Sequence, residues 1–180
     1  MKRRIVTLLL PIVILLSFTS VNWAGDFTFR KTNWGMSKYD VKVSESLNVE
    51  EENNSGITYR TKVLGKNVML AYFFDDNKLT SALYILNECY TDDYDYIKDH
   101  ALFQKNLREK YGEEKTETID KKDIPTSILT DPDAEIRMIK EGYMQIHSSW
   151  KTHSTKIKLI INSNNNKIVS SIYYEPIPDL

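Results

Sequence analysis

The sequence predicts a two-layer α+β domain, in which two main helices pack on an antiparallel sheet of about six or seven strands. Two observations lead to this class. The spacing of apolar residues changes from a helical period of 3.6 to a strand period of 2 twice along the chain, in the same order. Short polar turns separate the strand-like segments, which favours antiparallel hairpins. We therefore expect a duplicated plan of one helix and three strands in each half, with both helices on one face of the sheet.

The first half of the plan begins with a helix at Ser37–Leu47. Ser37 can cap its N-terminus. Its apolar stripe is expected to consist of Met36, Tyr39, Val43 and Leu47. The segment 50–56 is rich in Glu and Asn, and we interpret it as a solvated loop. Three strands are then expected at 57–63, 68–74 and 79–86.

The second half begins with a longer helix at Tyr94–Tyr111, preceded by acidic capping residues and followed by Gly112 in the usual C′ position. His100 falls outside the apolar arc of this helix, so we expect it at the surface. Residues 113–141 are poor in apolar side chains and contain two prolines, which indicates a weak strand around 115–120 followed by a long irregular loop. Three further strands are expected at 143–150, 155–161 and 167–174.

Residues 1–24 have the features of a secretory signal peptide. Lys2, Arg3 and Arg4 precede a mostly apolar run that extends to Phe18 and is too short for a comfortable membrane span. We predict cleavage after Ala24, with an uncleaved anchor as the alternative. A lipid anchor is not expected, because the only cysteine in the chain is Cys89. The predicted location is therefore secreted or periplasmic, at the cell envelope, with no stable membrane span after cleavage.

Residues 25–180 are expected to form one extracytoplasmic domain. Hydrophobic residues make up 41% of the sequence and charged residues 27%, which is typical of a globular protein. A chain of this length can bury a core without a metal or cofactor, and we predict neither. The formal net charge of −1 becomes more negative when the basic leader is removed. This balance disfavours nucleic acid as a partner, since phosphate binding depends on clustered Lys and Arg.

The segment from Trp34 to Val41 carries a motif, with Trp34-Gly35-Met36-Ser37 followed by Val41. It resembles the start of a group of secreted and lipoprotein-type bacterial proteins of unknown function, in which a Trp-Gly-Met-Ser element opens the first helix. More distantly, the Gly-Met-Ser-x-x-x-Val core resembles the BamE-like superfamily of outer-membrane-assembly lipoproteins. The resemblance implies an extracytoplasmic, non-catalytic role and a helix-opening structural element. We expect Trp34 itself to pack against the protein rather than to bind a ligand.

Recognisable catalytic patterns are missing from the sequence. It contains no glycine-rich phosphate loop, zinc-binding pattern or serine-hydrolase motif. The acidic clusters at 75–76, 92–95 and 131–133 lack the calcium-loop pattern and are interpreted as turns, caps and loops. Cys89 is expected to be a half-buried, inert thiol. The chain is therefore predicted not to be an enzyme, although a small hydrolase using Cys89 or a histidine remains an alternative.

The predicted function is a non-enzymatic binding or accessory module whose site is an aromatic face of the sheet. Five residues are expected to share that face: Tyr84, Tyr143, Gln145, His147 and Tyr173. Tyrosine gives a large contact area at a low entropic cost, so an unknown protein or an envelope glycan is the expected partner. The alternatives are a sheet face that simply tolerates tyrosine, a small envelope hydrolase and an enzyme inhibitor.

Overall fold

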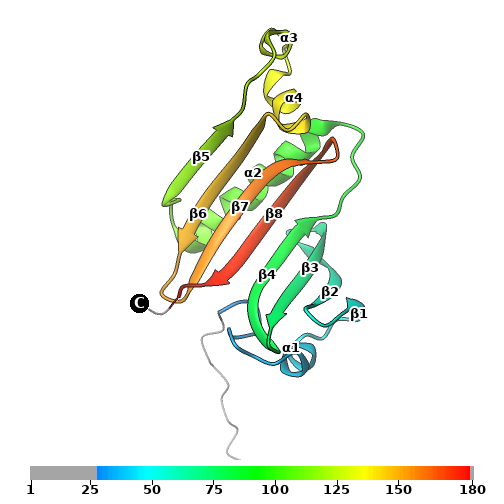
Figure 1. Ribbon diagram of the computed structural model, residues 1–180, viewed down its shortest axis with the longest axis vertical. Coiled ribbons are helices and arrows are strands. Elements are labelled where there is room, and N and C mark those ends of the chain that lie inside the picture. The colour runs from blue at the N-terminus through cyan, green and yellow to red at the C-terminus, as the bar shows by residue number, and fades with distance from the viewer. Residues whose placement is uncertain (1–27, 179–180) are drawn as a thin grey trace, which may run out of the picture.

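The computed structural model describes residues 28–178, without the side chains of 116–118 and 120. The predicted signal peptide lies outside the described residues. The elements, in chain order, are α1 (Lys38–Ser44), β1 (Val49–Glu52), β2 (Gly56–Val63), β3 (Lys66–Asp75), β4 (Lys78–Leu86), α2 (Asp93–Tyr111), β5 (Thr116–Lys121), α3 (Thr126–Leu129), α4 (Ala134–Lys140), β6 (Met144–Lys151), β7 (Thr155–Asn164) and β8 (Lys167–Pro176) (Figure 1).

The described strands form one antiparallel sheet in the order β1-β2-β3-β4-β8-β7-β6-β5. The α+β class with an antiparallel sheet is therefore confirmed, but the sheet has eight strands rather than six or seven. The weak strand expected around 115–120 is β5. The additional strand is β1, which lies partly in the segment interpreted as a loop, so that interpretation is wrong. Its four residues are all exposed, and it adds a short edge beside β2.

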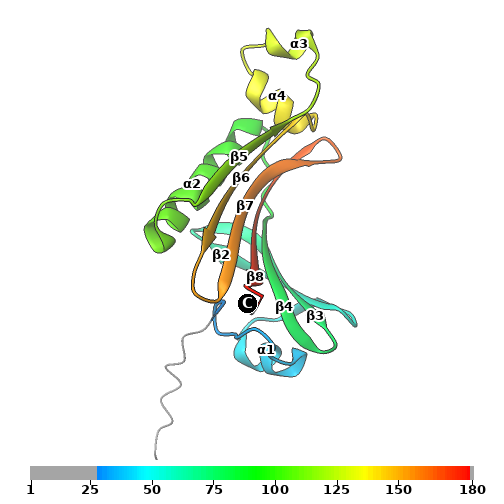
Figure 2. The ribbon, with the colours of Figure 1, turned by 60° about the vertical axis from the view of Figure 1, so that its left-hand side comes forward.

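One face of the sheet, here called the inner face, carries the main core. Its central row runs through five neighbouring strands and consists of Tyr59, Leu70, Tyr84, Ile172 and Leu159, all of them buried. Phe103 and Leu107 of α2 and Val41 of α1 belong to the same core cluster. Figure 2 shows α2 lying along one side of β5, β6 and β7. The opposite side of the sheet is called the outer face.

The first helix is shorter than predicted and buries a different residue. Ser37 caps it as expected, since its hydroxyl accepts a hydrogen bond from the Asp40 amide at 3.2 Å. The predicted apolar stripe is wrong, because Tyr39 is 74% and Val43 66% exposed whereas Val41 is fully buried. The helix ends at Ser44, and the chain then turns so that the side chain of Glu45 enters the core.

The Trp34-Gly35-Met36-Ser37 motif joins α1 to the sheet. The Gly35 amide donates to the Leu79 carbonyl, and the Leu79 amide donates to the Met36 carbonyl, each at 2.9 Å. Gly35 has a φ of +83°, which glycine adopts at little cost. The Trp34 indole packs against the main core, as expected, and its Nε1 donates to Thr155 Oγ1 at the start of β7 at 3.1 Å.

The second helix begins and ends close to the prediction, but its buried side differs. Asp92 caps its N-terminus, and Gly112 follows its last residue. Asp99 and His100 are buried beside Phe103 and Leu107, whereas Tyr94 is 46% exposed. The prediction that His100 lies at the surface is therefore wrong. Polar side chains can occupy the buried stripe because the sheet supplies their partners.

The segment expected to be a long irregular loop contains two short helices, α3 and α4. Their apolar residues form a second, smaller core with β6, β7 and β8, which includes Ile128, Ile139, Met144, Ile161 and Ile168. The two prolines do not interrupt either helix, since Pro125 precedes α3 and Pro132 lies between the two. A few apolar residues at helical spacing are therefore sufficient to bury one side of α3 and α4.

Candidate functional site

Cys89 and His100, two of the residues considered for catalysis, lie in different surroundings. Cys89 is exposed, so the expectation of a half-buried thiol is wrong. His100 lies in the core, where its Nδ1 is 3.0 Å from the Ser170 hydroxyl. Across residues 28–178, no group of three or more His, Cys, Asp or Glu side chains is arranged to hold a metal ion. Asp92, in one of the acidic clusters, caps α2 as predicted.

Tyr84 does not lie on the predicted binding face. It belongs to the inner face and is only 8% exposed. Its hydroxyl accepts a hydrogen bond from Arg30 Nη1 at 3.0 Å, and its ring meets the Tyr174 ring nearly edge-on. The face was misassigned because β4 is buried on both sides, with Leu83 only 6% exposed, so alternation does not separate its two faces.

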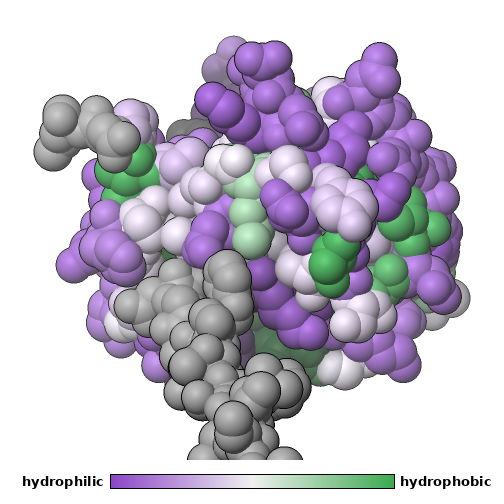
Figure 3. Space-filling view, turned by 90° about the horizontal axis from the view of Figure 1, so that it is seen from below, coloured by the Kyte–Doolittle hydropathy of each residue, from purple (hydrophilic) through white to green (hydrophobic). Residues whose placement is uncertain are grey.

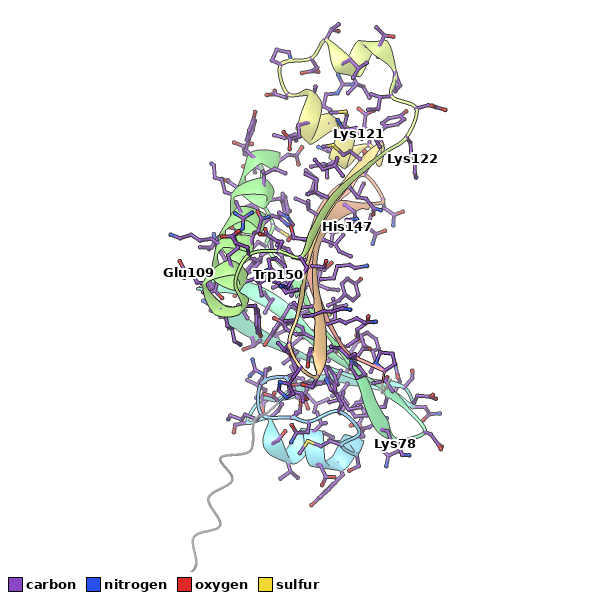
Figure 4. The ribbon with its side chains drawn as sticks, turned by 90° about the vertical axis from the view of Figure 1, so that its left-hand side faces the viewer. Lys78, Glu109, Lys121, Lys122, His147 and Trp150 are labelled. Atoms are coloured by element: carbon purple, nitrogen blue, oxygen red, sulfur yellow. The ribbon has the colours of Figure 1, made fainter. Side chains whose placement is uncertain are left out.

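The outer face brings together three of the five predicted residues. Strand register places Tyr173 beside Lys158, and His147 beside Ile160. Gln145 shares the face of His147, since the two are two positions apart on β6. Figure 4 shows His147 on the side of the sheet away from α2, and Trp150 on the side toward it. Tyr143 precedes β6 and is half-buried against the smaller core, apart from the other three.

A groove of about 770 Å³ lies beside Tyr173 on the outer face, in the half of the sheet formed by β5, β6, β7 and β8. We call it the lysine groove. Its lining includes Ile160 and Tyr173, with four lysines around them: Lys115, Lys151, Lys156 and Lys158. Glu175 is the one carboxylate among the described lining residues, and it lies 3.5 Å from Lys156 Nζ. The groove therefore combines excess positive charge with an aromatic ring that is 43% exposed.

A partly buried ion pair lies on the inner side of the sheet, beside a cavity that Arg30 and Tyr84 line. The fully buried Glu45 carboxylate accepts from Arg30 Nε at 2.7 Å and from Nη2 at 3.0 Å, and the Tyr72 hydroxyl donates to it as well. Burial alone would lower the pKa of Arg30, but its hydrogen bonds to Glu45 and Tyr84 hold it above the ordinary value. The guanidinium is thus charged and fixed in one orientation.

Comparison with known proteins gives no relative: no family model, curated protein or solved structure matches this chain. The likeness of the opening motif to secreted bacterial proteins and to BamE-like lipoproteins stays a prediction. Within the described residues, no helix is both long enough and apolar enough to cross a membrane. Seen from the α1 end, the visible surface is mostly hydrophilic, with small and separate apolar areas (Figure 3).

Sequence reasoning missed the lysine groove and the ion pair, since both depend on residues that are distant in the sequence. Lys115 and Lys158 are far apart in the sequence, and only the pairing of β5, β6 and β7 brings their strands together. Arg30 lies before the first predicted helix, in a segment without a helical or strand-like spacing of apolar residues. A signal for the groove exists in β7, where Lys156 and Lys158 alternate with buried Ile157 and Leu159.

Proposed function

We propose that this protein is a non-enzymatic, extracytoplasmic binding module that docks an acidic segment of a partner protein in the lysine groove. The observation that carries the proposal is the clustering of four lysines around Tyr173 and Ile160 on the outer face. This local excess of positive charge occurs in a chain whose formal net charge is −1. Complementary charge directs a partner to such a surface and suppresses partners of like charge.

The chemistry of the groove favours a polypeptide over an envelope glycan. Lysine ammonium groups bind carboxylates as point charges and do not require a planar partner. Ile160 and the exposed part of Tyr173 offer apolar contact between these charges. An acidic segment with interspersed aromatic or aliphatic side chains can satisfy both features at once. A glycan would leave Ile160 unmatched, so we treat glycan binding as an outcome of the test.

The fold supports a duplicated, two-layer architecture for this module. Each half begins with a helix and contributes four strands, and the order β1-β2-β3-β4-β8-β7-β6-β5 is the one that an approximate twofold axis between β4 and β8 would produce. The plan would then be one helix and four strands, not one helix and three. The position of α2 and α4 against β6, β7 and β8 supports a helical layer on the inner face. The leader at residues 1–24 supports export.

The proposal is tested with a polypeptide probe and two matched variants. Fluorescence anisotropy would measure binding of a labelled copolymer of glutamate and tyrosine, with polygalacturonate as the anionic glycan. The test variant changes three exposed groove lysines, Lys115, Lys151 and Lys158, to Gln. The control variant changes three exposed lysines outside the groove, Lys31, Lys62 and Lys78, to Gln. Lys78 is the first residue of β4, and Figure 4 shows it well apart from Trp150, one of the residues that line the groove.

We expect the groove variant to bind the copolymer about tenfold more weakly than the control variant, because three surface ion pairs of about 0.5 kcal/mol each are lost. Binding should weaken as salt is raised. Tyr173→Ser should reduce binding of the copolymer but not of poly-glutamate. Equal loss in the two lysine variants would contradict the proposal. Preferential binding of polygalacturonate would replace the polypeptide partner with a glycan.

A further inference from the structure

A second cavity lies where the two halves of the chain meet on the inner side of the sheet. We call this cavity, of about 640 Å³, the inter-half cleft. Phe29, Arg30 and Tyr84 line it from the first half, and Leu107, Lys110 and Tyr174 from the second. Its volume falls in the range of roughly 300–1,000 Å³ that is typical of small-molecule sites. The function proposed for the lysine groove does not involve this cavity.

The walls of the cleft are aromatic and rigid. The Phe29 ring lies with its centroid 4.5 Å from that of Tyr174 and 5.4 Å from that of Tyr84. All three rings are buried and belong to the main core, so their orientations are fixed by packing. Leu107 and Tyr111 of α2 extend the apolar wall. A flat, apolar ligand body would therefore be received without reordering the site.

The polar groups of the cleft favour an anion. Arg30 uses three N–H groups on Glu45 and Tyr84, out of about five that a guanidinium carries. The charge of Lys110 has no ion-pair partner among the described residues, and its Nζ lies 4.9 Å from the Tyr111 ring centroid. No Asp or Glu is present among the described lining residues. The lining thus offers cationic donors and, at Ser154 and Thr155, hydroxyls.

We infer that the inter-half cleft binds a small aromatic carboxylate. The aromatic body packs against the wall formed by Phe29, Tyr111 and Tyr174, and the carboxylate is directed to Lys110 and the remaining N–H groups of Arg30. Glu45 is a positioning residue in this arrangement, since it fixes the guanidinium from the far side and contributes no lining surface. The site spans both halves, so binding links α2 to the segment that precedes α1.

The probe for this site is 2-naphthoate, and its uncharged counterpart is 2-naphthamide. Isothermal titration of the purified protein would give both affinities. The test variant is Lys110→Gln, and the matched control is Lys105→Gln, which changes an exposed lysine of the same helix outside the cleft. A blocking variant, Asn106→Trp, places a large side chain at the cleft without altering its charge. Thermal melting checks that each variant is folded.

Saturable binding of naphthoate, at least tenfold tighter than that of naphthamide, is the expected result, since a charge-assisted hydrogen bond contributes enough for roughly such a factor. Lys110→Gln should remove most of this preference, Asn106→Trp should abolish binding, and Lys105→Gln should change neither. Equal affinity for acid and amide, an unchanged preference in Lys110→Gln, or no saturable binding would overturn the inference. None of these outcomes bears on the lysine groove, whose lysines are untouched.

Discussion

His100 should make the stability of this protein depend on pH in a defined window. The imidazole is 7% exposed, between α2 and β8, and its Nδ1 lies 3.0 Å from the Ser170 hydroxyl. Burial disfavours the charged imidazolium and lowers the pKa of His100 from 6.5 to about 4. A neutral ring can share one hydrogen bond with Ser170, whereas a protonated ring would leave a charge in the core.

The sign and size of the effect follow from the two pKa values. Between about pH 6.5 and pH 4, the unfolded chain binds a proton at His100 that the folded chain does not bind. The free energy of unfolding therefore falls as the pH falls through this window, and it is restored as the pH rises to neutrality. At about 1.4 kcal/mol for each unit of pKa difference, His100 alone removes roughly 3 kcal/mol by pH 4.

Urea unfolding at several values between pH 7.5 and pH 4 would measure this effect in wild type, His100→Gln and His153→Gln. Gln at position 100 stays neutral, so its variant should lack about 3 kcal/mol of the acid loss, whatever its stability at pH 7.5. His153 is exposed in the β6–β7 turn, and its variant should keep the wild-type slope. Parallel curves for wild type and His100→Gln would refute the placement of a neutral imidazole in the core.

Three further substitutions test the packing. Glu45→Gln should lower the free energy of unfolding by about 1–3 kcal/mol in urea, because the buried carboxylate loses its charge-assisted hydrogen bonds from Arg30, whereas Glu52→Gln in an exposed pair should leave it nearly unchanged. Tyr59→Phe should raise it by about 1 kcal/mol, since this buried hydroxyl has no partner among the described residues, and a decrease would reveal one. Gly35→Ala should lower it by about 1–2 kcal/mol from backbone strain alone, since the added Cβ contacts nothing within 4 Å, and an unchanged midpoint would show a relaxed turn.

The sequence patterns predicted an element best where its signal was local. Asp92 and Gly112 mark the two ends of α2. Both ends could be predicted because side-chain capping and a positive φ are properties of single residues. The interior of the same helix was misread, because Asp99 and His100 break the apolar stripe and become compatible with burial only through Lys66 and Ser170. Such partners lie on strands that are distant in the sequence, so the local spacing of apolar residues does not predict them.

The candidate site was predicted only in outline, for reasons of register. Alternation correctly assigned Tyr173 and His147 to one face, since β8 and β6, which carry them, each have a more buried side. Alternation failed for Tyr84, because its strand β4 is buried on both sides. On such a strand the two faces are not distinguished, and an assignment that is wrong by one residue places every side chain on the other face. The lysine groove depends in addition on the order of β5, β6 and β7 in the sheet, which hydrophobic patterning does not encode.

The buried polar residues of α2 explain how one helix is held over both halves of the sheet. Asp99 binds Lys66 of β3, in the first half, at 2.7 Å, and accepts from the Tyr90 hydroxyl. One residue further on, His100 meets Ser170 of β8, in the second half. Apolar contacts such as those of Phe103 and Leu107 tolerate sliding, because the hydrophobic effect has no direction. Hydrogen bonds and ion pairs are directional and do not tolerate sliding. Those of Asp99 and His100 reach opposite sides of the β4–β8 junction, so together they fix the position of α2 along its axis and its rotation about that axis.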